Sequence, residues 1–218
     1  HPTLRRQRQM CIRDSLKQSA PQRPDNLNDM MPLYHAVAHG CKAGEYGNSF
    51  ELFRARIDRD GSGFSVQRLG AFGATLSMLS SFFHNPWTAP VTQGSDVMVQ
   101  SVVSCAAFAL RAIGRLSEAC EPMEIGFKLR QGDEDWSSSA AQASNLSELS
   151  LTLGDVSSAV RQGEQSVELA DRSGDAFMRM GSRTTLAAAL FCAGVTRWQG
   201  DRELPPGALA SGLSLIHI

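Results

Sequence analysis

The chain has 218 residues, a hydrophobic content of 42% and a formal charge of −1 at pH 7. Its lysines and arginines form no cluster beyond the first fifteen residues, which argues against a nucleic-acid partner, because phosphate binding needs clustered basic side chains. The most apolar run, residues 69–83, is shorter than the roughly 20 residues of a membrane-spanning helix. We therefore expect neither nucleic acid nor a membrane among its partners.

The two ends of the chain resemble translated sequencing adapter. Residues 5–15, RRQRQMCIRDS, and residues 213–218, LSLIHI, back-translate to the two orientations of one adapter. We therefore expect residues 1–15 and 213–218 to be adapter-derived, and residues 16–212 to be a fragment of a longer protein. The first fifteen residues hold four arginines and one aspartate, so the formal charge without them is −4.

Cysteine usage favours a reduced protein. Four cysteines remain in residues 16–212, without regular spacing and without a C-x-x-C pair. A chain of this length can bury a core without disulfides. We therefore expect a cytoplasmic location.

The first elements are a linker and a helix pair. Residues 16–30 are polar and contain two prolines, which favours a linker. In residues 31–57, apolar residues recur at helical spacing on both sides of Gly44. This pattern predicts a helix, a glycine turn and a second helix.

Two short patterns in this region could bind metal ions. His35, His39 and Cys41 lie near one another on the first helix, but no fourth ligand has a recognisable spacing. The stretch Asp58–Gly63, DRDGSG, resembles the first half of a calcium loop, yet Leu69 stands where such a loop needs a bidentate glutamate. We favour structural roles for the histidines and the cysteine, and a solvated helix-ending turn at residues 58–63, so no metal ion is expected.

Residues 65–83 predict an extra helix, because their large apolar residues recur at helical spacing. Two prolines and a glycine then break residues 84–96 into a loop that contains Trp87. This tryptophan is either an exposed recognition aromatic, and thus an alternative binding surface, or a side chain that packs onto the helices. Packing is the favoured interpretation.

Internal repetition dominates the second half of the chain. Gly114, Gly154 and Gly194 stand forty residues apart, each after a helical pattern. Glycine adopts the left-handed backbone of a helix end without steric strain, so each is expected to reverse the chain. The apolar positions that align in the three repeats are Ala106, Leu146 and Leu186; Ala109, Leu149 and Ala189; and Ile113, Leu153 and Ala193.

The second helices carry a small residue five positions after the turn glycine. Ala119 and Ala159 hold this position and leave room for a neighbouring helix, whereas Ser49 holds it in the first pair. One pair alone cannot bury both of its faces, so the units should stack. We expect helix pairs at residues 96–130 and 135–170, and one further helix at residues 175–194.

Residues 143–170, ASNLSELSLTLGDVSSAVRQGEQSVELA, resemble a tetratricopeptide repeat. The forty-residue period is similar to the long-helix variety of this family, found in kinesin light chains and in bacterial signalling ATPases, and the resemblance covers most of residues 31–194. It implies an all-α fold, a right-handed superhelix of antiparallel helix pairs (an α-solenoid), and a role in protein–protein interaction.

The last part of residues 16–212 departs from the repeat. After Gly194 the expected second helix is replaced by a sequence that contains Pro205, Pro206 and three glycines. We therefore predict irregular structure for residues 195–212. One hypothesis for its origin is a shift of the reading frame in the nucleotide sequence.

No catalytic or cofactor site is expected from the sequence. There is no G-x-x-x-x-G-K-[ST] motif, and no local motif supports cysteine–histidine chemistry with His39 or His84. The favoured function is a non-catalytic scaffold that binds a protein or peptide segment, which another domain of the same full-length chain could supply. The alternatives are an enzyme fragment with an unrecognised site and a free-standing peptide-binding adaptor.

In the family that the chain resembles, the first helix of each pair lines the peptide groove. Asparagine can bond both the donor and the acceptor of a peptide backbone, and arginine can pair with a carboxylate. Solvated polar faces are the alternative interpretation of these positions. The groove candidates are Ser104, Phe108 and Arg111; Asn145, Glu148 and Thr152; and Thr184 and Ala188.

Overall fold

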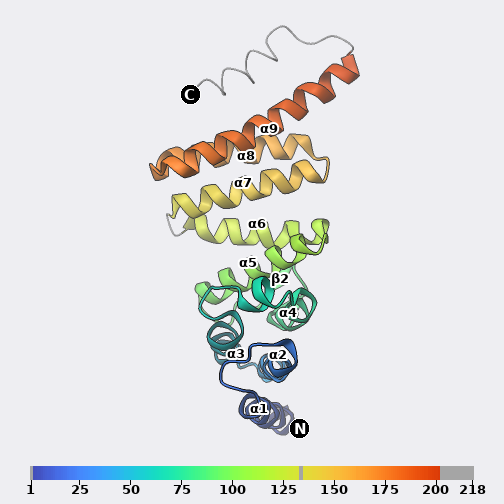
Figure 1. The fold of residues 1–218 in the computed structure, drawn as a ribbon, viewed down its shortest axis with the longest axis vertical. Helices are drawn as coiled ribbons and strands as arrows, with labels where there is room; N and C mark the ends of the chain where they lie inside the picture. Colours follow the sequence, from blue (N-terminus) through green and yellow to red (C-terminus); the bar gives the residue numbers. More distant parts are fainter. Residues whose placement is uncertain (1, 133–134, 202–218) are drawn as a thin grey trace. The chain divides into compact units, whose positions relative to one another are not determined.

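The computed structural model describes residues 2–132 and 135–201, and this part of the chain is helical apart from one short β-hairpin (Figure 1). The all-α class, built from packed helix pairs, is therefore confirmed. The chain divides into two compact units, His1–Pro122 and Met123–Ile218.

The first unit contains, in chain order, α1 (Pro2–Ser19), α2 (Leu27–Lys42), α3 (Tyr46–Leu52), the π-helical segments η1 (Phe53–Asp58) and η2 (Phe64–Arg68), α4 (Phe72–Leu79), the 3-10 turn η3 (Ser80–Phe82), the strands β1 (Phe83–Asn85) and β2 (Ala89–Pro90), and α5 (Asp96–Ala112). Helix α6 (Leu116–Gly132) begins in the first unit and ends in the second. The second unit also contains α7 (Trp136–Thr152), α8 (Val156–Ser173) and α9 (Ala176–Asp201).

Helix α2 is the central element of the first unit and packs against α1, α3, η1 and α4. Asn26 caps its N-terminus by accepting a 2.9 Å hydrogen bond from the amide of Asp29. The side chains of Met30, Leu33 and Val37 on this helix are fully buried. Helix α5 packs on α4 and buries its own apolar face beside it.

Residues 2–15, expected to be adapter-derived, form most of α1, and this helix lies against α2. No side chain of Pro2–Ser19 is buried, and the contacts with the rest of the unit include an ion pair of 2.8 Å between Arg6 and Glu45. The expected linker, residues 16–30, is non-helical only between α1 and α2.

One buried guanidinium holds the connection between α1 and α2. Arg56 of η1 is 8% exposed, and it donates four hydrogen bonds of 2.6 to 3.3 Å to backbone carbonyls. Because these bonds replace water around the guanidinium, the charge can be buried without a carboxylate partner. The four acceptors belong to Lys17, Ala20, Pro21 and Gln22.

The structure differs from the single helix expected at residues 65–83. Gly70 has a φ of +62°, and this left-handed residue separates η2 from α4. The amide of Ala71 bonds the carbonyl of Ser65 at 2.9 Å and closes the break. A glycine inside an apolar pattern thus ends one helical segment and lets the next start at Phe72.

In the second unit, hydroxyl–backbone contacts show that α7 and α8 are antiparallel. Ser147 Oγ donates to the carbonyl of Ala159 at 2.7 Å, and Ser166 Oγ donates to the carbonyl of Ala140 at 2.9 Å. The contacts run backward along α7 while they run forward along α8. Helix α9 packs on both α7 and α8, and Ser166 Oγ lies 2.7 Å from Ser182 Oγ of α9.

Three turns share one set of backbone hydrogen bonds. Gly44, Gly114 and Gly154 have φ values of +77°, +79° and +85°. In each turn the glycine amide bonds the carbonyl three residues back at 2.9 to 3.1 Å, and the next amide bonds the carbonyl five residues back at 2.9 Å. These are the bonds of a Schellman helix end. The small residues five positions after the glycines, Ser49, Ala119 and Ala159, are all fully buried, as the sequence predicts.

Gly194 does not form the predicted turn, because α9 continues through it to Asp201. A glycine inside a helix costs only about 1 kcal/mol relative to alanine, so glycine alone does not end a helix. At the Gly154 turn the next residue, Asp155, also caps the following helix, although the Gly44 turn forms without such a cap. Residues 195–201, expected to be irregular, are thus helical, and residues 202–218 lie outside the described part of the chain.

Candidate binding surface

The polar face of α7 carries three of the predicted groove residues. Asp135 caps the helix by accepting a 3.1 Å hydrogen bond from the amide of Ser138, and the Ser138 side chain, followed by this amide, lowers the pKa of the Asp135 carboxyl. The core face of α7 is fixed by Leu146 and Leu149, which are 4% and 2% exposed. The opposite side is therefore exposed, and it carries Asn145, Glu148 and Thr152.

The aligned apolar positions are confirmed as core in two rows out of three. Ala106, Leu146 and Leu186 are buried, and so are Ala109, Leu149 and Ala189. Ile113 and Leu153 are each 42% exposed, and both are C-cap residues directly before the left-handed turn glycines.

Thr184 and Ala188 of α9 are exposed, and Thr184 Oγ1 donates to the carbonyl of Met180 at 3.1 Å. Thr184 is equivalent, by the forty-residue offset, to Ser144 of α7, whose hydroxyl lies 2.8 Å from Thr185 Oγ1 of α9. In α7 this position contacts the next first helix and does not face a groove. Thr184 therefore belongs to a different surface from Asn145 and Glu148.

The remaining candidates lie on α5 in the first unit. Ser104 and Arg111 are half-buried, whereas Phe108 is 49% exposed and its ring lies 6.4 Å from that of Phe72. The candidates on α5 thus lie in the first unit, and those on α7 and on α9 lie on two different surfaces of the second unit.

Trp87 is not an exposed recognition residue, because its side chain is only 7% exposed. It lies between strands β1 and β2 with a φ of +70°, and its ring meets that of Phe83 edge-on at 5.3 Å. The favoured packing interpretation is correct. The alternative surface at Trp87 would require the hairpin to open.

The candidate metal patterns serve local structure. Burial raises the pKa of the Cys41 thiol to about 12, and His39 Nδ1 is hydrogen-bonded to Gln9. Asp58 accepts a 2.7 Å hydrogen bond from the amide of Gly61 in a turn that ends η1. The turn is as predicted, but Asp58 is buried and not solvated, and this burial raises the pKa of its carboxyl. Across residues 2–132 and 135–201, no three histidine, cysteine or acidic side chains converge on a metal site.

The first unit contains a cavity of about 450 Å³ beside α1 and α3. Arg56 lines it, but its guanidinium is already committed to four backbone carbonyls. Glu51 also lines it and is paired with Arg54 at 3.1 Å. The other lining residues are Arg13, Lys17, Gln22, Asn48, Leu52 and Ala55.

Sequence reasoning missed an apolar surface on α9. Phe177, Met180 and Phe191 are 68%, 62% and 67% exposed, opposite the buried Ser182 and Leu186 of the same helix. The signal was present in the spacing, since apolar residues recur on two opposite faces of this helix.

Comparisons with protein-family models, curated proteins and solved structures find no match. Within the described residues, each helix is too short or too polar to cross a bilayer.

Proposed function

We propose that this chain is a non-catalytic scaffold of the tetratricopeptide type, which holds a segment of another protein or of another domain of its own full-length chain. The proposal includes a right-handed superhelix of helix pairs whose first helices line a concave groove. The recurrent turn carries the proposal: the same backbone bonds follow Gly44, Gly114 and Gly154, and a small buried residue follows each glycine at the same distance.

The exposed face of α7 is the best-defined part of the proposed groove. Asn145 and Glu148 lie one turn apart on that face, beside the buried Leu146 and Leu149 that fix the orientation of the helix. An exposed asparagine on a rigid helix can bond an extended peptide without a change in the core. On α5, in the first unit, Arg111 is a separate candidate that would pair with a carboxylate.

Panning a random-peptide display library against the full chain would test the proposal, with affinities of selected peptides measured by calorimetry. We expect Asn145→Ala to weaken binding about tenfold, which corresponds to about 1.4 kcal/mol for a lost hydrogen bond. The double variant with Arg111→Ala should weaken binding further. The matched control is Glu164→Ala on the exposed side of α8, which should bind normally.

Two outcomes would overturn the groove. Binding could survive the double substitution at full strength while circular dichroism shows an intact fold. Selected peptides could also map to the hairpin at residues 84–96 in cross-linking experiments, and this result would favour the surface around Trp87 instead.

A further inference from the structure

The exposed side of α9 is an apolar face that no helix among residues 2–132 and 135–201 covers, and we call it the α9 face. It contains no charged residue. Its three large side chains are each more than 60% exposed, a high value for phenylalanine and methionine. The α9 face consists of Phe177, Met180, Gly181, Thr184, Ala187, Ala188 and Phe191.

Part of the equivalent face of α7 contacts other helices, whereas the position of Ala188 corresponds to the exposed Glu148. At the forty-residue offset, Met180, Thr184 and Ala187 correspond to Ala140, Ser144 and Ser147. On α7, the carbonyl of Ala140 and the hydroxyl of Ser147 bond α8, and the hydroxyl of Ser144 bonds α9. The α9 face therefore continues an established helix-packing surface of this unit, and in the described residues no helix covers it.

The residues of the α9 face are arranged symmetrically about Thr184. Phe177 precedes it by seven residues and Phe191 follows it by seven, so each ring lies about 10 Å from Thr184 along the helix axis. An antiparallel helix of the same sequence would place Phe177 against Phe191 at both ends. Met180 would meet Ala188, so that a large side chain faces a small one.

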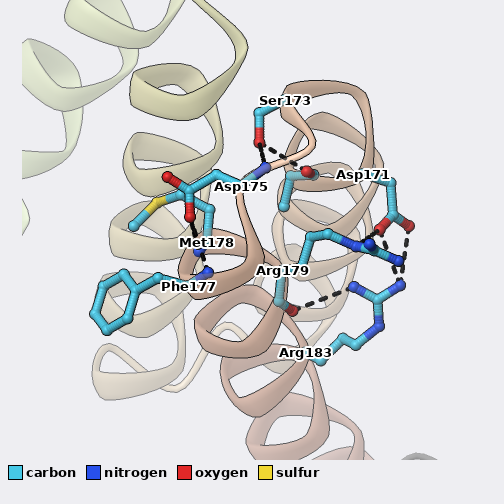
Figure 2. A network of polar contacts seen from close by, with 8 residues as sticks. Asp171, Ser173, Asp175, Phe177, Met178, Arg179 and Arg183 are labelled. Carbon is cyan, nitrogen blue, oxygen red and sulfur yellow. Dashed lines mark hydrogen bonds and ion pairs between the residues drawn. The ribbon is translucent and has the colours of Figure 1, made fainter.

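One carboxylate offsets part of the positive charge beside the α9 face. Arg179 and Arg183 lie on its flank, and both bond the carboxylate of Asp171 at 2.9 to 3.0 Å. Figure 2 shows this cluster on one side of the start of α9, with the ring of Phe177 pointing to the other side. Two copies would thus bring less net positive charge together than unpaired arginines would.

We propose that the α9 face binds a second copy of this chain, with the two α9 helices antiparallel and Thr184 at the two-fold axis. A two-fold interface requires a self-complementary patch, and the symmetric spacing of the two phenylalanines provides one. An amphipathic helix of another protein could also bury the face, but the face carries no charge that would select such a helix. This surface is separate from the peptide groove on α7.

Sedimentation velocity of the full chain tests the proposal. The wild-type chain, of 23.6 kDa, should form a dimer as its concentration rises. Thr184→Arg places two cations against each other at the axis and should raise the dissociation constant about tenfold or more. As a matched control, Val97→Ser with Phe108→Ser removes similarly exposed apolar side chains from α5 and should leave the dimer intact.

A cross-linking experiment reports the geometry without depending on the stability of the arginine variant. Thr184→Cys, in a chain whose Cys11, Cys105, Cys120 and Cys192 are replaced by alanine, should join two copies through a short bis-maleimide, because both thiols lie at the axis. Glu164→Cys on α8 should not. A wild-type chain that stays monomeric at every concentration overturns the proposal. A dimer that survives Thr184→Arg also overturns it, and so does a dimer in which Thr184→Cys fails to cross-link. Either result would assign the dimer to another surface.

Discussion

Gly163 of α8 lies directly against Leu186 of α9. A Cβ atom at Gly163 would stand 3.1 Å from Leu186 Cδ1 and 3.2 Å from Leu186 Cα. The second contact is with backbone, which cannot turn away as a side-chain end can. The absence of a side chain at residue 163 therefore sets how closely α8 and α9 approach.

Gly163→Val should destabilise the second unit by about 1 to 3 kcal/mol, because the new side chain forces the two helices apart. Gly181 provides the contrast: it lies in the interior of α9, and a Cβ there would meet nothing within 4 Å. Gly181→Ala should stabilise by up to about 1 kcal/mol through helix propensity. Urea unfolding of both variants gives the comparison, and equal shifts for the two would contradict the close contact.

Leu146→Asp should unfold the second unit, because it places an unpaired carboxylate in a position that is 4% exposed between packed helices. The matched control is Asn145→Asp, which adds the same charge at the adjacent exposed residue and should retain the fold. Far-ultraviolet circular dichroism and thermal melting distinguish the two. Retained helicity and cooperativity in Leu146→Asp would refute the assignment of this residue to the core.

Arg56→Met should destabilise the first unit by about 2 to 4 kcal/mol, because four backbone carbonyls lose a charged donor. Deletion of residues 1–15 together with 213–218 should have little effect, less than about 1 kcal/mol. The N-terminal part of α1 buries no side chain, and its ion pair with Glu45 is exposed. The backbone carbonyls that Arg56 bonds lie in residues 17–22, which the truncated chain keeps. Chemical denaturation measures the free energy of unfolding of both variants. A larger loss of this free energy on truncation than on Arg56→Met would contradict the prediction.

Stability should fall at acidic pH, in part through Asp171. Arg183 and Arg179 hold the pKa of its carboxyl below the ordinary value of 3.8. The unfolded chain therefore binds a proton more readily, so the stabilisation is present above pH 3.8 and is lost as the pH falls through the lower folded pKa. Urea midpoints measured across this range should depend less on pH in Asp171→Asn. The difference should be small and salt-sensitive, because the pair is exposed.

The helix–turn–helix pattern could be predicted from the sequence where several local signals agree. At Gly154, an apolar helical face, a glycine and the capping Asp155 all favour the same turn. At Gly194 the helical pattern and the glycine are also present, yet the helix continues to Asp201. The break at Gly70 was missed because the apolar spacing of residues 65–83 continues across it, although the glycine itself has a left-handed backbone conformation.

Surfaces were predicted less completely than turns. The exposure of Asn145 and Glu148 follows from the core spacing of α7, and it was predicted. The α9 face was not, because its phenylalanines and methionine look like core residues until the opposite face of the same helix is known to be buried. Hydrophobicity indicates which side chains prefer burial, but not which of two apolar faces has a neighbour.

The buried serines of the second unit fix the position of α8 along α7. Ser147 and Ser166 each donate to one particular carbonyl of the facing helix, in positions that water does not reach. If α8 slid along α7 by one turn, both hydroxyls would lose their acceptors inside the protein, where an unpaired hydroxyl costs about 1 to 3 kcal/mol. Under tension, α7 and α8 should therefore keep their alignment up to a threshold force and then separate in one step, without first sliding along one another.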